Sequence, residues 1–255
     1  MRHKKKVNIP VVYNSSQNII RGTDTLPIAL WDYPKVMVFI PLERSLPYAD
    51  RTVPALWGIA RQGADALFVD TGEVCQTINY GISIFLKEKQ MTHFLILDND
   101  HIHPIDIIQR LARWVEKDRS VQVVGGVNFR RSEPFDPAIF WKDNEVPDKY
   151  YTKEYDEIDW EAGLIEVDAI GAGCLLIARE VFEKLEQPYW EWGYSKVEKT
   201  NGRSPSPDVI FSEKCRNIGV KLYADTTTTS PHLTKYAVDK RVYQKYCNES
   251  LIKEA

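Results

Sequence analysis

Two carboxylates that could share one cation stand directly after an apolar run, at Asp98 and Asp100. The run before them, 94–97, reads Phe-Leu-Ile-Leu, which is typical of a strand buried on both faces of a parallel sheet. Residues i and i+2 of an extended chain point to the same side, so the two acids can converge on one ion. They would lie at the carboxyl end of the strand, where open α/β sheets bind ligands, and Pro104 fits the first position of a following helix. The pattern suggests a divalent cation that carries a diphosphate, although a charged turn is the more common explanation of an acidic pair taken alone.

The overall composition is that of an ordinary globular protein. The chain has 255 residues, of which 44% are hydrophobic and 27% charged, enough for one large domain or two small ones. A net charge of −3 gives no general attraction to nucleic acid or to anionic membranes. The first six residues include four basic side chains and a histidine, but no apolar signal segment follows, and we expect no membrane-spanning helix. We interpret this start as a solvated terminus; an arm that contacts phosphate is the alternative.

The four cysteines are widely spaced, and no two of them form a Cys-x-x-Cys pair. Each lies in an apolar or helical context, which predicts reduced, partly buried thiols in a cytoplasmic protein. The spacing indicates neither a zinc site nor a disulfide framework. These residues are Cys75, Cys174, Cys215 and Cys247.

Apolar strands alternate with amphipathic helices from residue 35 onward, which predicts an α/β domain with a parallel sheet. The expected strands cover 35–41, 66–70, 93–97 and 121–127, and the expected helices cover 52–61, 74–88 and 105–115. Residues 1–34 form an extension with little regular structure.

The second half of the chain is less regular. Residues 129–164 have no clear period and are rich in aromatic side chains, which we interpret as anchors of loops; stacking on a sugar or base is the alternative. Later elements are expected as a strand over 165–170, a glycine-containing strand to 178, helices over 179–186 and 206–218, a strand over 220–224 and a helical tail over 236–255, with a second irregular region at 187–206.

Four segments, in this order, resemble glycosyltransferases of the GT-A fold, especially the family-2-like group that uses nucleotide sugars. They are the strand with Asp-x-Asp and a downstream proline (94–104), the glycine-containing strand with an Arg-Glu-x-Phe helix (170–182), the acidic helix with the strand after it (206–223) and a terminal histidine motif (231–233). The resemblance spans 35–235 and implies a GT-A type, Rossmann-like, mostly parallel central sheet flanked by helices, in a single domain with irregular acceptor loops.

The resemblance also implies a metal site. Asp100 would coordinate the cation, Asp98 would contact the ribose, a metal-bound water or the metal itself, and His232 would add a ligand from the far end of the sequence. Oxygen ligands suit Mg²⁺ or Mn²⁺, and an added imidazole favours Mn²⁺. His101 and His103 could substitute, but we expect them to flank the helix start. The spatial prediction is that His232 lies near Asp100.

Asp208 is the implied general base, which takes the proton of the acceptor hydroxyl and gives inversion at the anomeric carbon. Pro207 stands where the family often has Glu, so Asp208 is the sole carboxylate of that pair. Stabilisation of a helix N-terminus is the alternative role, and in a retaining reaction Asp208 would position the donor.

The remaining implied residues bind the nucleotide-sugar donor or line the acceptor side. Asp70 would bind the nucleobase. Gly171 and Gly173 would let the substrate approach the backbone closely, although tight packing of the strand explains these glycines nearly as well. The others are Pro41, Glu43 and Arg44 for base and ribose, Gly171 and Gly173 beside the donor sugar, and Trp192, with Trp190, as an acceptor platform.

The resulting hypothesis is a metal-dependent glycosyltransferase that acts on a hydroxyl acceptor. The acceptor class stays open among saccharide, lipid-linked sugar, protein and modified nucleic acid. A non-catalytic sugar-nucleotide-binding module on the same scaffold is one alternative. A haloacid-dehalogenase-like phosphatase is another, but two strands precede the Asp-x-Asp strand here, whereas that strand normally comes first in those enzymes.

Overall fold

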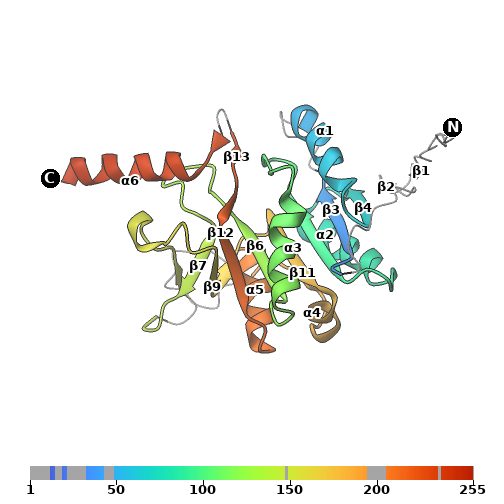
Figure 1. Ribbon diagram of the computed structural model, residues 1–255. Helices are drawn as coiled ribbons and strands as arrows, with labels where there is room; N and C mark the ends of the chain where they lie inside the picture. Colours follow the sequence, from blue (N-terminus) through green and yellow to red (C-terminus); the bar gives the residue numbers. More distant parts are fainter. Residues whose placement is uncertain are drawn as a thin grey trace.

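The computed structural model describes residues 12–14, 19–21, 33–42, 49–146, 149–193, 205–234 and 237–254. Within them, a nine-stranded sheet forms the centre of the molecule (Figure 1). Its strands are β1 (Val12–Asn14), β2 (Ile19–Arg21), β3 (Val36–Pro41), β4 (Asp65–Val69), β5 (His93–Leu97), β6 (Val123–Asn128), β9 (Leu164–Val167), β11 (Cys174–Ala178) and β12 (Leu222–Ser230), in the spatial order β1-β2-β4-β3-β5-β11-β6-β12-β9.

The central sheet is mostly parallel, as predicted. Strands β3, β4, β5, β6 and β12 run in the same direction, because β3 pairs in parallel with β4 and β5, and β6 with β12, while β11 pairs antiparallel with both β5 and β6. The carboxyl ends of these five strands therefore meet at one edge of the sheet. The antiparallel direction of β11, β9 and β2 was not predicted.

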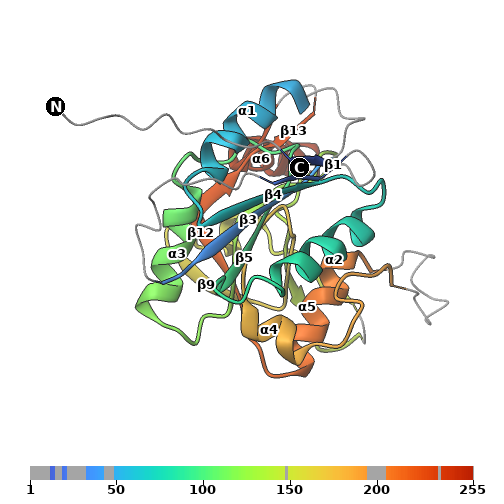
Figure 2. The same cartoon turned by 90° about the vertical axis from the view of Figure 1, so that its right-hand side faces the viewer.

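Helices cover both faces of the sheet, as Figure 2 shows: α1 (Ala49–Ala60) and α3 (Ile107–Lys117) on one face, and α2 (Val74–Phe85), α4 (Arg179–Lys184) and α5 (Pro207–Asn217) on the other. Successive side chains of a strand alternate between the faces, so Val38 and Phe39 of β3 belong to different core clusters. In α3, Ile108, Leu111 and Val115 recur at helical spacing and are at most 1% exposed. Burying each of them contributes about 1.5–3 kcal/mol.

Two smaller sheets and a helix complete the fold. One sheet contains β7 (Ile139–Lys142), β8 (Tyr150–Tyr151) and β10 (Ala169–Ile170), and the other pairs β13 (His232–Leu233) with β14 (Ala237–Val238). A 3-10 helix covers Tyr155–Glu157. The first turns of α6 (Lys240–Glu254) pack on the core through the buried Tyr243, and its far end projects from the main body (Figure 1).

The prediction that 129–164 lacks regular structure was wrong in part, because β7, β8 and the start of β9 lie within it. Its aromatic side chains do anchor the fold: Phe129 is 1% and Trp160 7% exposed, and the Trp160 indole N–H donates to the Tyr155 carbonyl at 2.9 Å. The expected single strand 165–170 divides at Asp168, whose carboxylate accepts from the Lys142 backbone N–H at 2.8 Å. The chain thereby passes from the central sheet at β9 to the small sheet at β10.

The last strand is longer than predicted. It continues past residue 224 to Ser230, through a register shift between Asp225 and Thr229. The buried Asp225 carboxylate holds this irregular stretch by accepting from Thr227 Oγ1 at 2.6 Å and Thr228 Oγ1 at 2.8 Å. Both ends of the strand therefore belong to the sheet, and its carboxyl end reaches the edge where the other parallel strands end.

The proposed division at residues 34 and 235 stays a prediction. β1 and β2 come from the first 34 residues and extend the sheet beside β4, and β14 pairs with β13 across residue 235. All four cysteines are free, as predicted, while the cytoplasmic location stays a prediction. Among the described helices, none combines the length and the apolar character needed to cross a membrane.

Candidate active site

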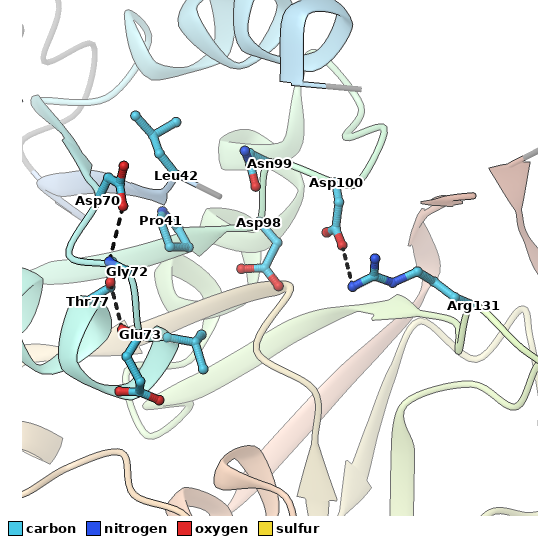
Figure 3. Close-up of a pocket in the computed structure, with 11 residues that line it drawn as sticks. Pro41, Leu42, Asp70, Gly72, Glu73, Thr77, Asp98, Asn99, Asp100 and Arg131 are labelled. Carbon is cyan, nitrogen blue, oxygen red and sulfur yellow. Dashed lines mark hydrogen bonds and ion pairs between the residues drawn. The ribbon is translucent and has the colours of Figure 1, made fainter. Parts of the chain in front are cut away.

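A pocket of about 590 Å³ lies at the carboxyl edge of the parallel strands (Figure 3). Pro41 ends β3, Asp70 follows β4 and Asp98 follows β5, so three neighbouring strands each deliver a side chain to the same place. The described residues that line it are Pro41, Leu42, Asp70, Gly72, Glu73, Val74, Thr77, Asp98, Asn99, Asp100 and Arg131.

His232 lies next to Asp100, and the predicted proximity of these residues is confirmed. The segment after β12 pairs with the segment after β5: the Leu233 N–H donates to the Asp100 carbonyl at 2.8 Å, and the Ile102 N–H to the Pro231 carbonyl at 2.9 Å. This pairing places His232 Nε2 at 2.9 Å from Asp100 Oδ2. The roles of both residues as metal ligands stay a prediction.

The hydrogen bond on the other side of the His232 ring determines what Nε2 can do. His232 Nδ1 is 2.7 Å from the carbonyl oxygen of Phe129, which can only accept, so Nδ1 carries the proton. In the neutral imidazole the Nε2 lone pair then faces the Asp100 carboxylate, and this contact requires either a second proton or a cation between the two groups. A ring held in this way through its second nitrogen is the usual arrangement of a metal-ligating histidine.

His101 belongs to the same cluster. Its ring stacks on that of His232 at a centroid distance of 4.1 Å, and its Nδ1 lies 2.7 Å from Asp100 Oδ1. The residue is 4% exposed, and within the described part of the chain neither ring nitrogen has a hydrogen-bond partner of suitable geometry. Ligand atoms of Asp100, His101 and His232 all lie within 4.8 Å of one another, and such a set of oxygen and imidazole donors fits a divalent cation.

The expectation that His101 and His103 flank the helix start was wrong, because α3 begins at Ile107 and both side chains point back to the site. His103 is a positioning residue: its Nε2 donates to the Asp98 carbonyl at 3.0 Å, and its Nδ1 accepts from Ser230 Oγ at 2.9 Å. Burial lowers the pKa of His103 to about 3, so the ring stays neutral and keeps this pattern.

The charge of the cluster is concentrated on Asp100. Burial by itself would raise the pKa of Asp100, but the contacts from His101 and His232 outweigh it and hold the pKa well below its usual range. Burial lowers the pKa of His101, so this imidazole is neutral and retains a lone pair for a cation. The cluster thus combines the ionised carboxylate of Asp100 with the neutral imidazole of His101.

Asp98 points into the pocket (Figure 3) but is outside this group of three. Its backbone N–H donates to the Gly173 carbonyl at 3.0 Å, which fixes the glycine segment beside it. A Cβ on Gly173 would lie 2.7 Å from Asn128 Nδ2 and 2.9 Å from His101 Cε1. The close approach of β11 to the cluster therefore requires glycine at this position, and the predicted roles of Asp98 and Gly173 toward a ligand stay predictions.

Asp208 lies in the first turn of α5, behind Gly171. Its Oδ1 accepts from Trp190 Nε1 at 3.2 Å, and a Cβ on Gly171 would come within 2.8 Å of Ala138 Cβ and 3.9 Å of Asp208 Oδ2. Burial raises the pKa of Asp208, although hydrogen bonds from Trp190 and from the Ala172 backbone favour its charged form. A carboxyl group with a raised pKa is suited to accept a proton near neutral pH.

Asn79 positions Trp190 for that contact. Its Oδ1 accepts from the N–H groups of Tyr189 and Trp190, both at 3.0 Å, and its Nδ2 donates to the Trp190 carbonyl at 2.7 Å. The Trp190 ring stacks on Phe211 at 3.8 Å and is 1% exposed, so it is a core residue and no acceptor platform. The sequence contains no signal for the role of Asn79, because one polar residue on an amphipathic helix is ordinary.

Trp192 is 56% exposed, and its indole N–H donates at 3.0 Å to Oε1 of Glu73, which lines the pocket. Glu73 also caps α2 by accepting from the Gln76 N–H at 2.7 Å. Asp70 lines the pocket and accepts from the Gly72 N–H at 3.1 Å. Two predicted donor-binding residues, Glu43 and Arg44, lie outside the described residues.

Comparison with known proteins provides fold relatives and no sequence relatives. No protein-family model matches the chain, and no curated protein matches it by sequence. A solved structure described as A197 from STIV covers 81% of this chain and 87% of its own, with a TM-score of 0.54 and 19% identity. The fold is of the GT-A type. The structure of GalNAc-T7 with UDP, GalNAc and Mn²⁺ covers 84% of this chain and 47% of its own, with a TM-score of 0.49 and 13% identity. A glycosyltransferase involved in glycosylation of the PBCV-1 major capsid covers 61% and 69%, with a TM-score of 0.34 and 12% identity.

Proposed function

We propose that this GT-A-type protein is a metal-dependent glycosyltransferase, which moves a sugar from a nucleotide-diphosphate sugar to a hydroxyl acceptor. The observation that supports this proposal best is the meeting of Asp100, His101 and His232 beside the pocket. His232 is far from the adjacent Asp100 and His101 in the sequence, and the pocket lies where open α/β sheets bind ligands.

In the proposed site, Asp100, His101 and His232 hold a divalent cation, and Asp98 contacts the ribose or a metal-bound water. Two imidazoles beside one carboxylate favour Mn²⁺ over Mg²⁺. When bound, the cation supplies Lewis-acid stabilisation of the charge on the departing diphosphate. The Phe129 carbonyl keeps His232 Nε2 directed at the site, since it accepts from Nδ1 at 2.7 Å.

Asp208 is the proposed general base. Its carboxylate takes the proton of the acceptor hydroxyl as that oxygen attacks the anomeric carbon, which inverts the configuration. Trp190 orients the carboxylate through its contact with Oδ1. The raised pKa supports this role over simple stabilisation of the α5 N-terminus, because a carboxylate that only favours the helix dipole would have a lowered pKa.

We assign the remaining residues around the pocket to the donor or to the acceptor. Pro41 and Asp70, which end neighbouring strands, line the side that we assign to the nucleobase and ribose, together with Glu43 and Arg44 by the sequence resemblance. We assign the exposed Trp192 to the acceptor, because an indole face can cover an apolar sugar face while its N–H is held by Glu73.

Release of nucleoside diphosphate from a panel of nucleotide sugars tests the proposal. With Mn²⁺ we expect one donor to be turned over, by hydrolysis or transfer, and a chelator or the Asp100→Ala substitution to stop the release. Asp106→Ala is the matched control, because Asp106 is exposed and pairs with Arg110. Donor binding without turnover would favour a non-catalytic module, and full activity of Asp100→Ala would refute the metal-site assignment.

A further inference from the structure

A short hairpin between β6 and β7 contacts the candidate metal site. Its backbone is paired at three places: the Ala138 N–H donates to the Asn128 carbonyl at 2.7 Å, the Arg130 N–H to the Asp136 carbonyl at 2.9 Å, and the Phe135 N–H to the Ser132 carbonyl at 2.9 Å. The backbone of this hairpin, residues 128–138, therefore has a defined geometry.

Aromatic contacts and the cluster itself fix the hairpin to the body of the protein. Phe129 is buried and stacks on Trp160 at 6.2 Å, and Phe135 is 8% exposed with its ring edge-on to Tyr246 at 5.9 Å. The Phe129 carbonyl accepts from His232 Nδ1. A side chain near the end of the hairpin therefore has a fixed position relative to the candidate metal ligand His232.

Two consecutive arginines of the hairpin point to different surroundings. The Arg130 guanidinium lies 6.0 Å from the ring centroid of Phe140 and 3.8 Å from Asp136. Arg131 instead lines the pocket, with Nη2 at 3.1 Å from Asp100 Oδ2 (Figure 3). Its side chain is 47% exposed, so the rest of the guanidinium is open to a ligand in the pocket.

The charges around the pocket give Arg131 a specific task. Among the described lining residues, Asp70, Glu73, Asp98 and Asp100 carry carboxylates, and Arg131 carries the positive charge. A nucleoside diphosphate would bring further negative charge into these surroundings and needs cationic partners. A guanidinium has five N–H donors in a planar fork that matches two phosphate oxygens, and its contact with Asp100 occupies one nitrogen.

We propose that Arg131 binds the diphosphate of the donor and stabilises it as the leaving group; this inference rests on the proposed function. In the transfer step, the acceptor oxygen forms its bond to the anomeric carbon and the bond from that carbon to the diphosphate oxygen breaks. The hydroxyl proton passes to Asp208, and the electron pair of the broken bond stays on the diphosphate. Arg131 stabilises the charge that develops there, and a bound cation would share this role.

The test compares ligands that differ only in the diphosphate. Calorimetric affinities are measured in Mn²⁺ for UDP, GDP, ADP and CDP and for the matching nucleosides, with the wild type, Arg131→Gln, Arg131→Lys and Arg130→Gln. For the diphosphate that the wild type binds best, we expect Arg131→Gln to weaken binding roughly ten- to a hundredfold, the range of a hydrogen bond to a charged group. Arg131→Lys should be intermediate, and Arg130→Gln should match the wild type.

The nucleoside affinities and Mn²⁺ binding, followed by electron paramagnetic resonance, should be unchanged in Arg131→Gln. Equal loss for nucleoside and diphosphate, equal loss in Arg130→Gln, or loss of Mn²⁺ would overturn the inference, because each indicates a general effect on the site. Unchanged diphosphate binding by Arg131→Gln would overturn it while the proposed function stands. If the wild type binds none of the four diphosphates, the proposed function fails and the inference fails with it.

Discussion

Two carboxylates to which we assign different roles, Asp100 and Asp208, have opposite electrostatic surroundings. Asp100 is contacted by two imidazoles and by the Arg131 guanidinium, and its pKa lies far below the ordinary value. Asp208 is contacted by the neutral donors of Trp190 and the Ala172 backbone, and burial raises its pKa. Both are aspartates in a GT-A-type fold, so the difference arises from their neighbours alone.

This difference separates two kinds of work. A carboxylate that stays ionised at every relevant pH can hold a cation but is a poor proton acceptor, whereas one with a raised pKa can take up a proton near neutrality. Pairs of acids whose surroundings move their pKa values apart commonly divide the roles in this way. We therefore assign the charge-holding role to Asp100 and the proton-accepting role to Asp208.

The largest effect is expected for Asp100→Asn, which keeps the shape of the side chain and removes its charge. Turnover with Mn²⁺ should fall roughly a thousandfold or more, because several kcal/mol of leaving-group stabilisation depend on the cation. Initial rates at saturating donor measure this loss, with Asp106→Asn as the control. Near-wild-type turnover by Asp100→Asn would show that this carboxylate holds no essential ion.

Asp208→Asn should reduce turnover by about a hundred- to ten-thousandfold, the usual contribution of a general base. Affinities for Mn²⁺ and for the donor should stay at wild-type values, in contrast to Asp100→Asn. Rates and calorimetric donor affinities together separate the two variants. Glu213→Gln is a matched control on the same helix, because Glu213 pairs with Lys142 at 3.6 Å. Loss of donor binding in Asp208→Asn would assign Asp208 to donor positioning instead.

The same substitution should stabilise the protein at pH 7–8. The folded-state pKa of Asp208 lies above its unfolded value, so folding favours the protonated form. As pH rises from the unfolded-state pKa to the folded-state pKa, Asp208 loses its proton first in the unfolded state, and the free energy of unfolding falls. Asp208→Asn removes this cost and should be more stable than the wild type at pH 8, with a smaller gain at pH 4. Urea unfolding at pH 4 and pH 8 measures the difference in the free energy of unfolding between the two proteins. If the wild type is more stable than Asp208→Asn at pH 8, burial does not raise the pKa of Asp208 as we infer.

A smaller effect is expected for Trp190→Phe, which keeps a ring against Phe211 and removes the indole N–H. That N–H stabilises the charged form of Asp208, so its loss should raise the pKa of Asp208 further. The acid limb of the kcat/KM profile should move to higher pH, with a modest loss of rate on the alkaline side. A limb that stays in place would mean that Asp208 does not govern it.

The parts of the site that follow from local sequence were predictable. The buried strand that ends at Asp98, the amphipathic helix with Asp208 in its first turn and the glycines of β11 each have a pattern within a few residues. Local burial, helical period and capping chemistry determine such features, so a single sequence contains them. The approach of His232 to Asp100 has no local pattern; it was implied by the family resemblance and is confirmed at 2.9 Å.

The remaining features depend on pairing between distant segments. His101 reaches the cluster because its backbone forms an antiparallel β-bridge with that of His232. Arg131 reaches the pocket because the backbone N–H of Arg130 donates to the carbonyl of Asp136 and holds the hairpin together. Neither pairing has a local signature. The position of β11 between β5 and β6, antiparallel to both, could not be predicted either, because a buried apolar run does not determine the order or direction of strands in a sheet. Two of the side chains that contact Asp100, those of His101 and Arg131, are therefore placed by backbone pairing of this kind.

The most direct test of the central claim is pulsed electron paramagnetic resonance of Mn²⁺ bound to the protein, which detects coupling to nitrogen nuclei of ligating imidazoles. If Asp100, His101 and His232 hold the ion, the wild type should show nitrogen modulation from two imidazoles. His101→Phe keeps a ring against His232 but removes the donor atom, and it should retain the modulation of one. Bound Mn²⁺ without nitrogen modulation, or no Mn²⁺ binding at all, would contradict the account.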